Sequence, residues 1–162
     1  MILVSIGSNL SGRVGAPIET VKESLTAFQA NGMNILACSE FYNTPPVGPP
    51  GQGDYVNLVV RVSSLLMPHG LLDRLQLIES QFGRQRSVKW GARTLDLDML
   101  DWHGHQMQGR LNLPHPELTK RGFVLRPLMD VAPEWRDPKS GKSVGVLWNS
   151  LGITERLKIV KL

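Results

Sequence analysis

Two aspartates, Asp96 and Asp98, alternate with apolar residues in the segment 94–100. On a β-strand this spacing points both carboxylates to one face, roughly 7 Å apart, because side chains alternate between the two faces. Like charges at that separation repel, which raises the pKa of at least one carboxyl group unless a cation lies between them. Two Mg²⁺ ions, typically about 3.5–4 Å apart in such sites, would use both carboxylates and bridge the oxygens of a polyphosphate. The alternative is an exposed sheet face with two solvated aspartates.

A basic stretch lies directly before the two aspartates. Residues 84–93 contain four basic side chains and no acidic one, so this stretch alone equals the net charge of +4 of the whole chain. The basic character is therefore local, which argues against a nucleic-acid-binding face spread along the chain. Guanidinium groups suit phosphate oxygens, and several on one loop can enclose a triphosphate. Although a charged loop often serves only solubility, its position beside the carboxylates predicts a site for a polyphosphate and a divalent metal.

Two other segments imitate nucleotide-binding motifs. Residues 140–143 read Ser-Gly-Lys-Ser, like the end of a P-loop, but position 136 is arginine where that motif requires glycine. Residues 7–10 read Gly-Ser-Asn-Leu and lack the three glycines of the dinucleotide fingerprint. His115 stands between two prolines, and it either hydrogen-bonds a phosphate or satisfies a turn. Any nucleotide is therefore expected to bind through a different kind of site.

The composition is that of one folded domain over residues 1–162. Hydrophobic residues make up 41% and charged residues 20%, which excludes a disordered or fibrous chain. Cys38 is the only cysteine, so neither an intramolecular disulfide nor a cysteine-rich zinc site is expected, and a reducing compartment is favoured. The start of the chain lacks the basic and apolar regions of a signal peptide, and no segment approaches the roughly 20 apolar residues of a membrane helix. We expect a cytoplasmic protein.

Periodicity and turn residues predict the elements that must position these groups. In the first half we expect strands over 2–7, 35–42 and 55–66, a helix over 17–31, and a loop over 44–53. The helix opens at a proline, which loses no hydrogen bond at the first helical position. The loop holds four prolines and three glycines in ten residues, which excludes a helix or a central strand, and such long loops are often functional. The strand that follows this loop places Tyr55 and Asn57 on one face.

A second helix is expected over 68–82, followed by a strand over 94–101. Gln76 and Glu79 face away from the leucine stripe of this helix and are expected to be ordinary surface residues. The order strand, helix, strand, strand, helix, strand predicts an α+β fold with a ferredoxin-like βαββαβ core, an antiparallel sheet and helices packed on it. A C-terminal extension is expected to hold a short extended segment at 110–113, helix and turn over 115–132 interrupted by Pro127, a helix over 144–151 and a strand over 157–160.

Several motifs occur in an order that resembles one enzyme family. The segments that carry the likeness are Gly7 to Leu10, Thr44-Pro45-Pro46 with Tyr55 and Asn57, Gly83 to Arg86, Trp90 to Asp98, Leu113 to Pro116, and Arg121 to Leu125. Together they resemble 6-hydroxymethyl-7,8-dihydropterin pyrophosphokinase of folate biosynthesis, from Gly7 to Pro133. This family transfers the terminal pyrophosphate of ATP to the hydroxymethyl group of the reduced pterin and releases AMP.

The resemblance implies a role for each matching residue. Asp96 and Asp98 would hold two Mg²⁺ ions, and the catalytic group would comprise these two with Arg84 and Arg93. The residues expected to bind the co-substrate ATP are Gln76, Arg86, Lys89, Trp90, Arg110, His115 and Arg121. The residues expected to form the pterin pocket are Thr44, Pro45, Pro46, Val47, Tyr55, Asn57 and Phe123. Tyr55 and Phe123 would enclose the flat ring while Asn57 pairs with its edge.

Three positions depart from the family pattern. Ala92 and Gly53 stand where proline is usual, and Asp101 stands where an apolar residue is usual. None of these departures removes an expected ligand. We expect them to affect the catalytic rate and how well the loops are ordered.

The main alternative function is a small ferredoxin-like module that binds single-stranded RNA through aromatic residues on its strands. Aromatic residues are only 6% of the chain, and the basic residues lie beside carboxylates that would repel a nucleic-acid backbone. A catalytically inactive relative is a second alternative, and the presence of every expected polar residue opposes it. We therefore expect a monomeric enzyme that acts on ATP and a reduced pterin and binds neither nucleic acid nor membrane.

Overall fold

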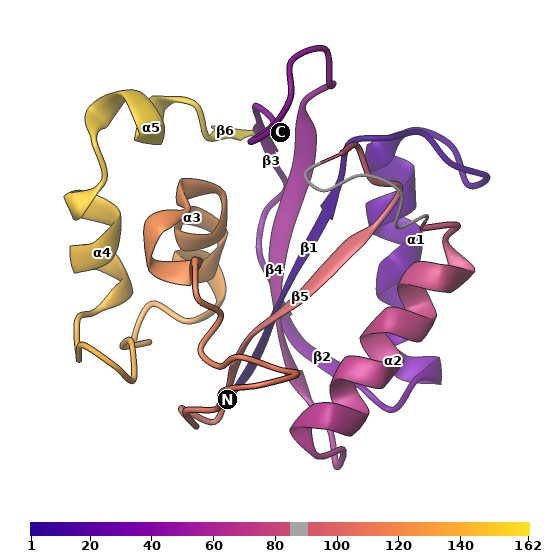
Figure 1. Ribbon diagram of the computed structural model, residues 1–162. Coiled ribbons are helices and arrows are strands. Elements are labelled where there is room, and N and C mark those ends of the chain that lie inside the picture. The colour runs from indigo at the N-terminus through magenta and orange to yellow at the C-terminus, as the bar shows by residue number, and fades with distance from the viewer. Residues whose placement is uncertain (85–90) are drawn as a thin grey trace.

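The computed structural model describes residues 1–84 and 91–162. Within this part of the chain, one antiparallel sheet lies between two groups of helices (Figure 1). Its strands are β1 (Ile2–Ser8), β2 (Asn34–Cys38), β3 (Tyr42–Thr44), β4 (Tyr55–Ser63), β5 (Asp96–Trp102) and β6 (Val160–Lys161). The helices are α1 (Pro17–Ala30), α2 (Pro68–Gln81), the short 3₁₀ helix η1 (Leu118–Lys120), α3 (Gly122–Val131), α4 (Val144–Ser150) and α5 (Ile153–Leu157). The α+β class and the antiparallel sheet are confirmed.

The sheet follows the order β5-β1-β4-β3-β6, and β2 pairs with β4 beside β3. The central strand β1 therefore has β4 on one side and β5 on the other. In this register Gly7 lies opposite Asn57 on β4 and opposite Asp96 on β5. At this level of the sheet, β1 therefore places a residue without a side chain between Asp96 on β5 and Asn57 on β4.

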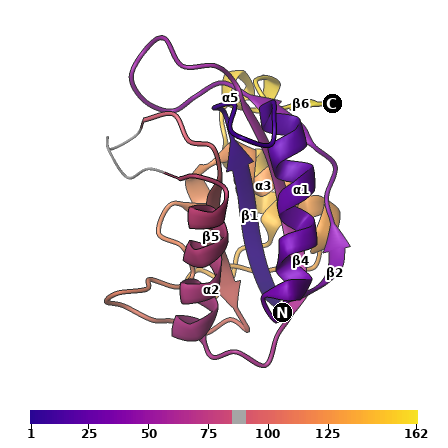
Figure 2. The same ribbon diagram turned by 90° about the vertical axis from the view of Figure 1, so that its right-hand side faces the viewer.

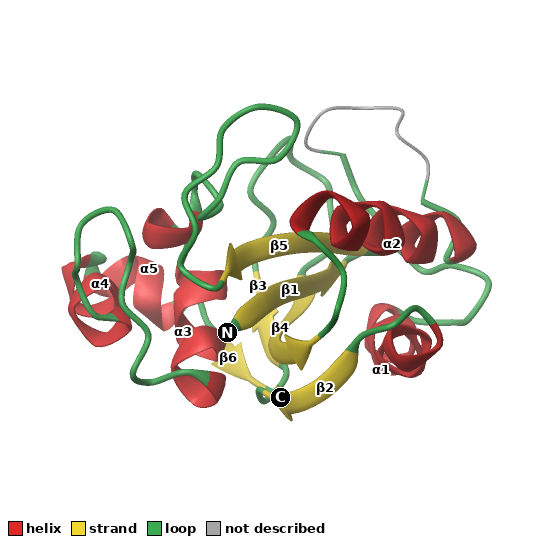
Figure 3. Cartoon of the chain, turned by 90° about the horizontal axis from the view of Figure 1, so that it is seen from below, coloured by secondary structure: helices red, strands yellow, loops and turns green. Residues whose placement is uncertain are grey.

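Each face of the sheet has its own apolar core. Helices α1 and α2 cover one face, which is turned toward the viewer in Figure 2, and α3 and α4 cover the other (Figures 1 and 3). On β4 the side chains of Val56, Leu58, Val60 and Val62 join the first core, whereas Val59 joins the second. This alternation follows from the period of two in a strand, and it confirms the predicted faces of this segment.

The two long helices begin and end where the sequence predicts. Pro17 and Pro68 occupy their first turns, where a missing N–H loses no hydrogen bond. Gly32 and Gly83 follow their ends with φ of 79° and 78°, a conformation that glycine adopts without steric cost. In the described residues, no helix is long and apolar enough to span a bilayer.

Several expected elements differ from the observed ones. The strand expected over 35–42 is two strands, because Ser39 between them makes side-chain and backbone hydrogen bonds to Val59. Pro127 does not interrupt the third helix but is buried inside it, where apolar packing offsets the missing N–H. The segment 110–113 forms only an isolated bridge, from Met107 to Leu113. The final strand is Val160–Lys161, because α5 extends to Leu157.

Candidate active site

A cavity of about 280 Å³ opens where β1 ends and where β4 and β5 begin. One group of its lining residues comprises the predicted pterin residues Thr44, Pro45, Val47, Tyr55, Asn57 and Phe123. The other comprises Arg93, Asp96, Asp98, His115 and Arg121, with Ser5, Gly7 and Gly91 between them. The fold therefore brings residues from the two predicted halves of the site into one space.

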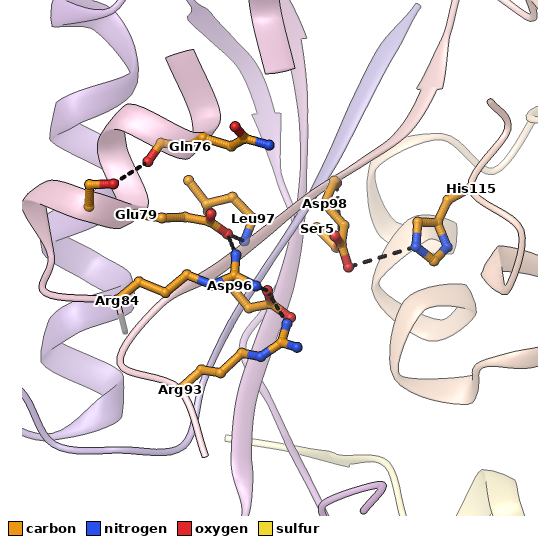
Figure 4. Close-up of polar contacts among 10 residues, drawn as sticks. Ser5, Gln76, Glu79, Arg84, Arg93, Asp96, Leu97, Asp98 and His115 are labelled. Carbon is orange, nitrogen blue, oxygen red and sulfur yellow. Dashed lines mark hydrogen bonds and ion pairs between the residues drawn. The ribbon is translucent and has the colours of Figure 1, made fainter. Parts of the chain in front are cut away.

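Two arginines converge on Asp96 at the start of β5. The Nη1 atom of Arg93 lies 2.5 Å from Asp96 Oδ1, and the Nη2 atom of Arg84 lies 3.0 Å from the same oxygen (Figure 4). Burial lowers the pKa of Arg93, but the charge and hydrogen bond of Asp96 outweigh it and raise that pKa overall. The two guanidinium groups therefore share one oxygen of Asp96.

Asp98 lies two residues further along β5 and faces His115 (Figure 4). Partial burial and the charge of Asp96 raise the pKa of Asp98, although His115, Arg121 and Arg93 act in the opposite direction. Burial lowers the pKa of His115. Its Nδ1 atom accepts the backbone N–H of Glu117 at 3.2 Å, so the neutral ring presents Nε2 to Asp98 at 3.9 Å. Within residues 1–84 and 91–162, the ion-pair contact of the Asp98 side chain is this one with His115 at 3.9 Å. The Asp98 carboxylate is therefore suited to a cation.

These carboxylates fit magnesium better than a metal held by protein alone. In residues 1–84 and 91–162, no group of three or more His, Cys, Asp or Glu side chains is placed to hold a metal ion. Mg²⁺ is commonly bound through one or two carboxylates together with substrate phosphates and water. Two aspartates beside arginines that can take phosphate are the donor set that such a shared site needs.

The half of the cavity that holds the predicted pterin residues is built on β3, β4 and α3. The Nδ2 atom of Asn57 donates to Thr44 Oγ1 at 2.7 Å, which orients the amide of a nearly buried side chain. Phe123 comes from the first turn of α3, and the Arg121 guanidinium lies 5.6 Å from the centre of its ring. Burial raises the pKa of the Tyr55 hydroxyl, so Tyr55 stays neutral. This half thus offers two aromatic rings and one oriented amide.

Gly7 lies between the two halves of the cavity and directly against Asn57. A Cβ atom on Gly7 would lie 2.7 Å from Asn57 Oδ1 and 3.5 Å from Tyr55 Cδ1. Real side chains do not approach to the first of these distances, so any other residue would displace Asn57. Gly7 therefore contributes through the absence of a side chain.

Glu79 was expected on the surface of α2, and that prediction is wrong. Its side chain is only 2% exposed, forms an ion pair with Arg84, and accepts the backbone N–H of Leu97 at 2.8 Å. Burial raises its pKa to about 7, although the bonds from Leu97 and Arg84 act against this shift. A signal existed in the sequence, because Glu79 lies four residues after Leu75 of the buried stripe.

Asn9 is a second residue whose role sequence reasoning missed. Its Oδ1 atom accepts the backbone N–H of Arg93 at 2.8 Å, and its Nδ2 atom donates to Gln52 Oε1 and to the carbonyl of Gly53. Backbone N–H groups of residues 9 and 10 donate in turn to the Arg93 carbonyl at 3.1 Å. Asn9 therefore links the proline-rich loop to the residue that contacts Asp96.

Some predicted site residues lie apart from the cavity. Arg110 is exposed and pairs with Asp73 on α2, and Gln76 is half-buried on α2. Pro46 and Arg84 do not line the cavity, although Arg84 reaches Asp96 from its rim. The expectations for Arg86, Lys89 and Trp90 lie outside the described residues.

Two questions raised by the sequence find structural answers. Residues 138–140 form a turn, and Ser143 forms a bridge with Arg136 and caps the first turn of α4 with its hydroxyl, so this segment is no P-loop. Asp101, which stands where an apolar residue is usual, is buried and accepts Trp135 Nε1–H at 3.0 Å and Gly104 N–H at 3.0 Å. Its polarity is thus satisfied away from the cavity.

Comparisons with known proteins show which proteins this chain resembles. The family model of 7,8-dihydro-6-hydroxymethylpterin-pyrophosphokinase matches residues 3–133. A Synechocystis protein named 2-amino-4-hydroxy-6-hydroxymethyldihydropteridine pyrophosphokinase is 41% identical over 137 residues, which is 83% of this chain and 70% of that protein. A Haemophilus influenzae protein of the same name is 39% identical over 157 residues, which is 96% of this chain and 89% of that protein.

Solved structures share the fold at low sequence identity. A Plasmodium falciparum HPPK-DHPS triple mutant with pteroate superposes with a TM-score of 0.73 at 12% identity, over 99% of this chain and 46% of that chain. An A437G form of the same protein with pteroate gives a TM-score of 0.72 at 13% identity, again over 99% of this chain and 46% of that chain. This chain therefore spans less than half of those larger polypeptides.

Proposed function

The chain belongs to the 7,8-dihydro-6-hydroxymethylpterin-pyrophosphokinase family and is a pyrophosphokinase, and on this premise we propose a magnesium-dependent transfer of pyrophosphate from ATP to 6-hydroxymethyl-7,8-dihydropterin. The products are AMP and the pterin diphosphate. The observation that carries the proposal is one cavity in which an aromatic and amide pocket adjoins two carboxylates and arginines, with Gly7 in register between Asn57 and Asp96. Such a cavity suits a flat polar ring beside a polyphosphate.

The acidic half would hold the metal and the phosphates. Asp96 and Asp98 would bind two Mg²⁺ ions, which supply neutralisation of the triphosphate charge and polarisation of the β-phosphorus. Arg84 and Arg93 both pair with Asp96, and a triphosphate offers these guanidinium groups oxygens of higher charge. We propose that they move from Asp96 to the phosphates when substrate binds, which leaves Asp96 as a ligand.

The reaction follows from the placement of the two halves. The hydroxymethyl oxygen attacks the β-phosphorus, the bond from that phosphorus to the oxygen of the α-phosphate breaks, and AMP leaves with that oxygen. The proton of the hydroxymethyl group passes to water. Catalysis in such a transfer is mainly positioning and charge stabilisation. Arg84 and Arg93 would stabilise the moving pyrophosphate, while His115 and Arg121 would hold the ATP phosphates. Gln76 and Arg110 would bind ATP at the outer end, together with Arg86, Lys89 and Trp90.

The aromatic half would select the pterin. Tyr55 and Phe123 would enclose the ring, and Asn57, oriented by Thr44, would pair with its polar edge. Pro45, Pro46 and Val47 would close the pocket from the proline-rich loop. We propose that the enzyme acts as a monomer in the cytoplasm, a reducing compartment that suits a chain with one cysteine.

The product distribution tests this proposal. Purified protein is incubated with ATP, Mg²⁺ and 6-hydroxymethyl-7,8-dihydropterin, and the products are resolved by phosphorus NMR and chromatography. We expect AMP and pterin diphosphate in equal amounts, and neither product after chelation of the metal. Stoichiometric ADP with a pterin monophosphate would overturn the mechanism. A metal-independent, salt-sensitive affinity for single-stranded RNA without turnover would instead support the alternative module.

A further inference from the structure

The last residues of the chain run along the outer edge of β3. Strand β6 pairs antiparallel with β3, with Lys161 opposite Tyr42 and Val160 opposite Asn43 (Figure 1). The backbone N–H of Leu162 extends this ladder to the Phe41 carbonyl at 2.9 Å. The Lys161 ammonium also donates to Glu40 at 2.7 Å. Residues 159–162, which we call the strap, therefore hold β3 through backbone bonds along its length.

The strap also touches the start of α3. A Cβ atom on Gly122 would lie 3.4 Å from the Ile159 Cγ1 atom and 3.4 Å from the Leu151 Cδ1 atom, so both side chains pack directly on the backbone of Gly122. Ile159 is half-buried there, unlike most of its neighbours in this segment. One short segment thus contacts two elements that are far apart in sequence.

Both of these elements lead directly into the pterin half of the cavity. Thr44 ends β3 and Pro45 follows it, while Phe123 comes directly after Gly122. Beneath the strap the same two elements are joined by a hydrogen bond of 2.7 Å from Tyr42 to Asp130 on α3. The two elements that lead to Thr44 and to Phe123 are therefore also joined to each other by this hydrogen bond.

The half of the cavity that holds Asp96 and Asp98, which we call the metal half, is supported by other elements. Asp96 and Asp98 lie on β5, at the opposite edge of the sheet from β6, and α2 supports this strand through the bond between Glu79 and Leu97. A change in the strap would consequently act on the separation between Phe123 and the Thr44–Pro45 corner, and it would not reach the aspartates directly.

We propose that the strap is a positioning element for the pterin pocket, with Ile159 as its key side chain. By packing on Gly122 while the strap pairs with β3, Ile159 sets the separation between Phe123 and the Thr44–Pro45 corner. This inference rests on the proposed function, because it assigns the strap to the pterin and not to the metal half of the same cavity. It gives the chain beyond residue 133, which the family match does not include, a part in substrate binding.

Ile159→Ala is the direct test, and Leu157→Ala is its matched control. Leu157 belongs to the same region but is 73% exposed, so its removal takes away a similar side chain without loosening the contact with Gly122. We expect Ile159→Ala to raise the KM for the pterin about three- to tenfold. Its kcat and the Mg²⁺ concentration for half-maximal activity should stay within about twofold of the unmodified protein. Ile159→Val should restore most of the pterin affinity, because it retains the branched contact.

Three results would overturn the proposal. The first is a pterin KM for Ile159→Ala equal to that of Leu157→Ala. The second is a loss confined to kcat or to the Mg²⁺ response. The third is a chain that ends after Lys158, remains folded by circular dichroism and binds the pterin as tightly as the full chain. Failure of the proposed function shows separately, as absence of AMP formation by the unmodified protein.

Discussion

The backbone N–H of Leu97 on β5 donates to Glu79 Oε1 on α2 at 2.8 Å. β5 is an edge strand of the sheet, so its outward N–H groups find no partner strand and need another acceptor. Leu97 lies between Asp96 and Asp98, and the same carboxylate pairs with Arg84. Helix α2 thus fixes both the strand that carries the proposed metal ligands and one of the proposed catalytic arginines.

The buried carboxyl group of Glu79 should make stability depend on pH. Its pKa of about 7 lies above the usual value of 4.5, so the folded protein binds this proton more tightly than the unfolded chain does. The free energy of unfolding therefore falls as pH rises from about 4.5 to about 7. Glu79→Gln removes this contribution. Relative to Glu79→Gln, the unmodified protein should lose about 2 kcal/mol of stability between about pH 5 and about pH 8.

Urea unfolding of both proteins without magnesium measures this difference. Glu134→Gln is the control, because Glu134 forms only an exposed ion pair with Arg61 at 3.6 Å. Its stability should follow that of the unmodified protein across the pH range. If the free energy of unfolding changes with pH equally in the unmodified protein and in Glu79→Gln, the prediction is contradicted.

Asp96→Asn and Asp98→Asn should each lower turnover by at least about 100-fold, because each removes a charged ligand from the proposed metal site. The fold should persist, since the substitution relieves the repulsion that helps to raise the pKa of Asp98. AMP release at saturating Mg²⁺ and thermal unfolding are the measurements. Glu134→Gln should retain full activity. An Asp98→Asn protein with ordinary turnover would place the metal elsewhere.

Gly7→Ala should damage pterin binding more than ATP binding. The new methyl group would meet Asn57 Oδ1 at 2.7 Å and displace the amide from its bond to Thr44. We expect the KM for the pterin to rise about tenfold or more, since overpacking of this kind typically costs 1–3 kcal/mol. Gly145→Ala is the control, because a Cβ atom at that position on α4 meets nothing within 4 Å. Equal pterin KM values for the two variants would refute the assignment of Gly7.

Asn9→Ala should remove the side-chain acceptor that holds the backbone N–H of Arg93. The Arg93 N–H loses its acceptor at 2.8 Å, so its hydrogen exchange should accelerate about tenfold, the effect of losing one ordinary hydrogen bond. Gln52→Ala removes the contacts of the Gln52 side chain with Asn9 and with the Pro49 carbonyl but keeps the acceptor of the Arg93 N–H, so it should leave exchange at Arg93 unchanged. Amide exchange followed by mass spectrometry or NMR resolves the two cases. Identical exchange at Arg93 in both variants would show that Asn9 does not hold this residue.

Local patterns in the sequence were sufficient for many elements of this fold. Proline and glycine punctuation predicted the limits of α1 and α2 closely, and the period of two predicted which side chains of β4 enter each core. The same period predicted that Asp96 and Asp98 share one face, and both line the cavity. These features depend on residues within a few positions of one another, which is why the linear sequence reveals them.

Tertiary structure alone decided the relationships between distant segments. The register of β1 between β4 and β5 places Gly7 beside Asn57 and Asp96, and no local pattern specifies a register. Glu79 was expected on the surface because it lies off the leucine stripe of α2, whereas its bond to Leu97 on β5 forms only in the folded chain. The contact of Ile159 with Gly122 likewise joins segments that only folding brings together. Periodicity indicates which face of an element is apolar, whereas packing between elements determines which polar group meets which partner.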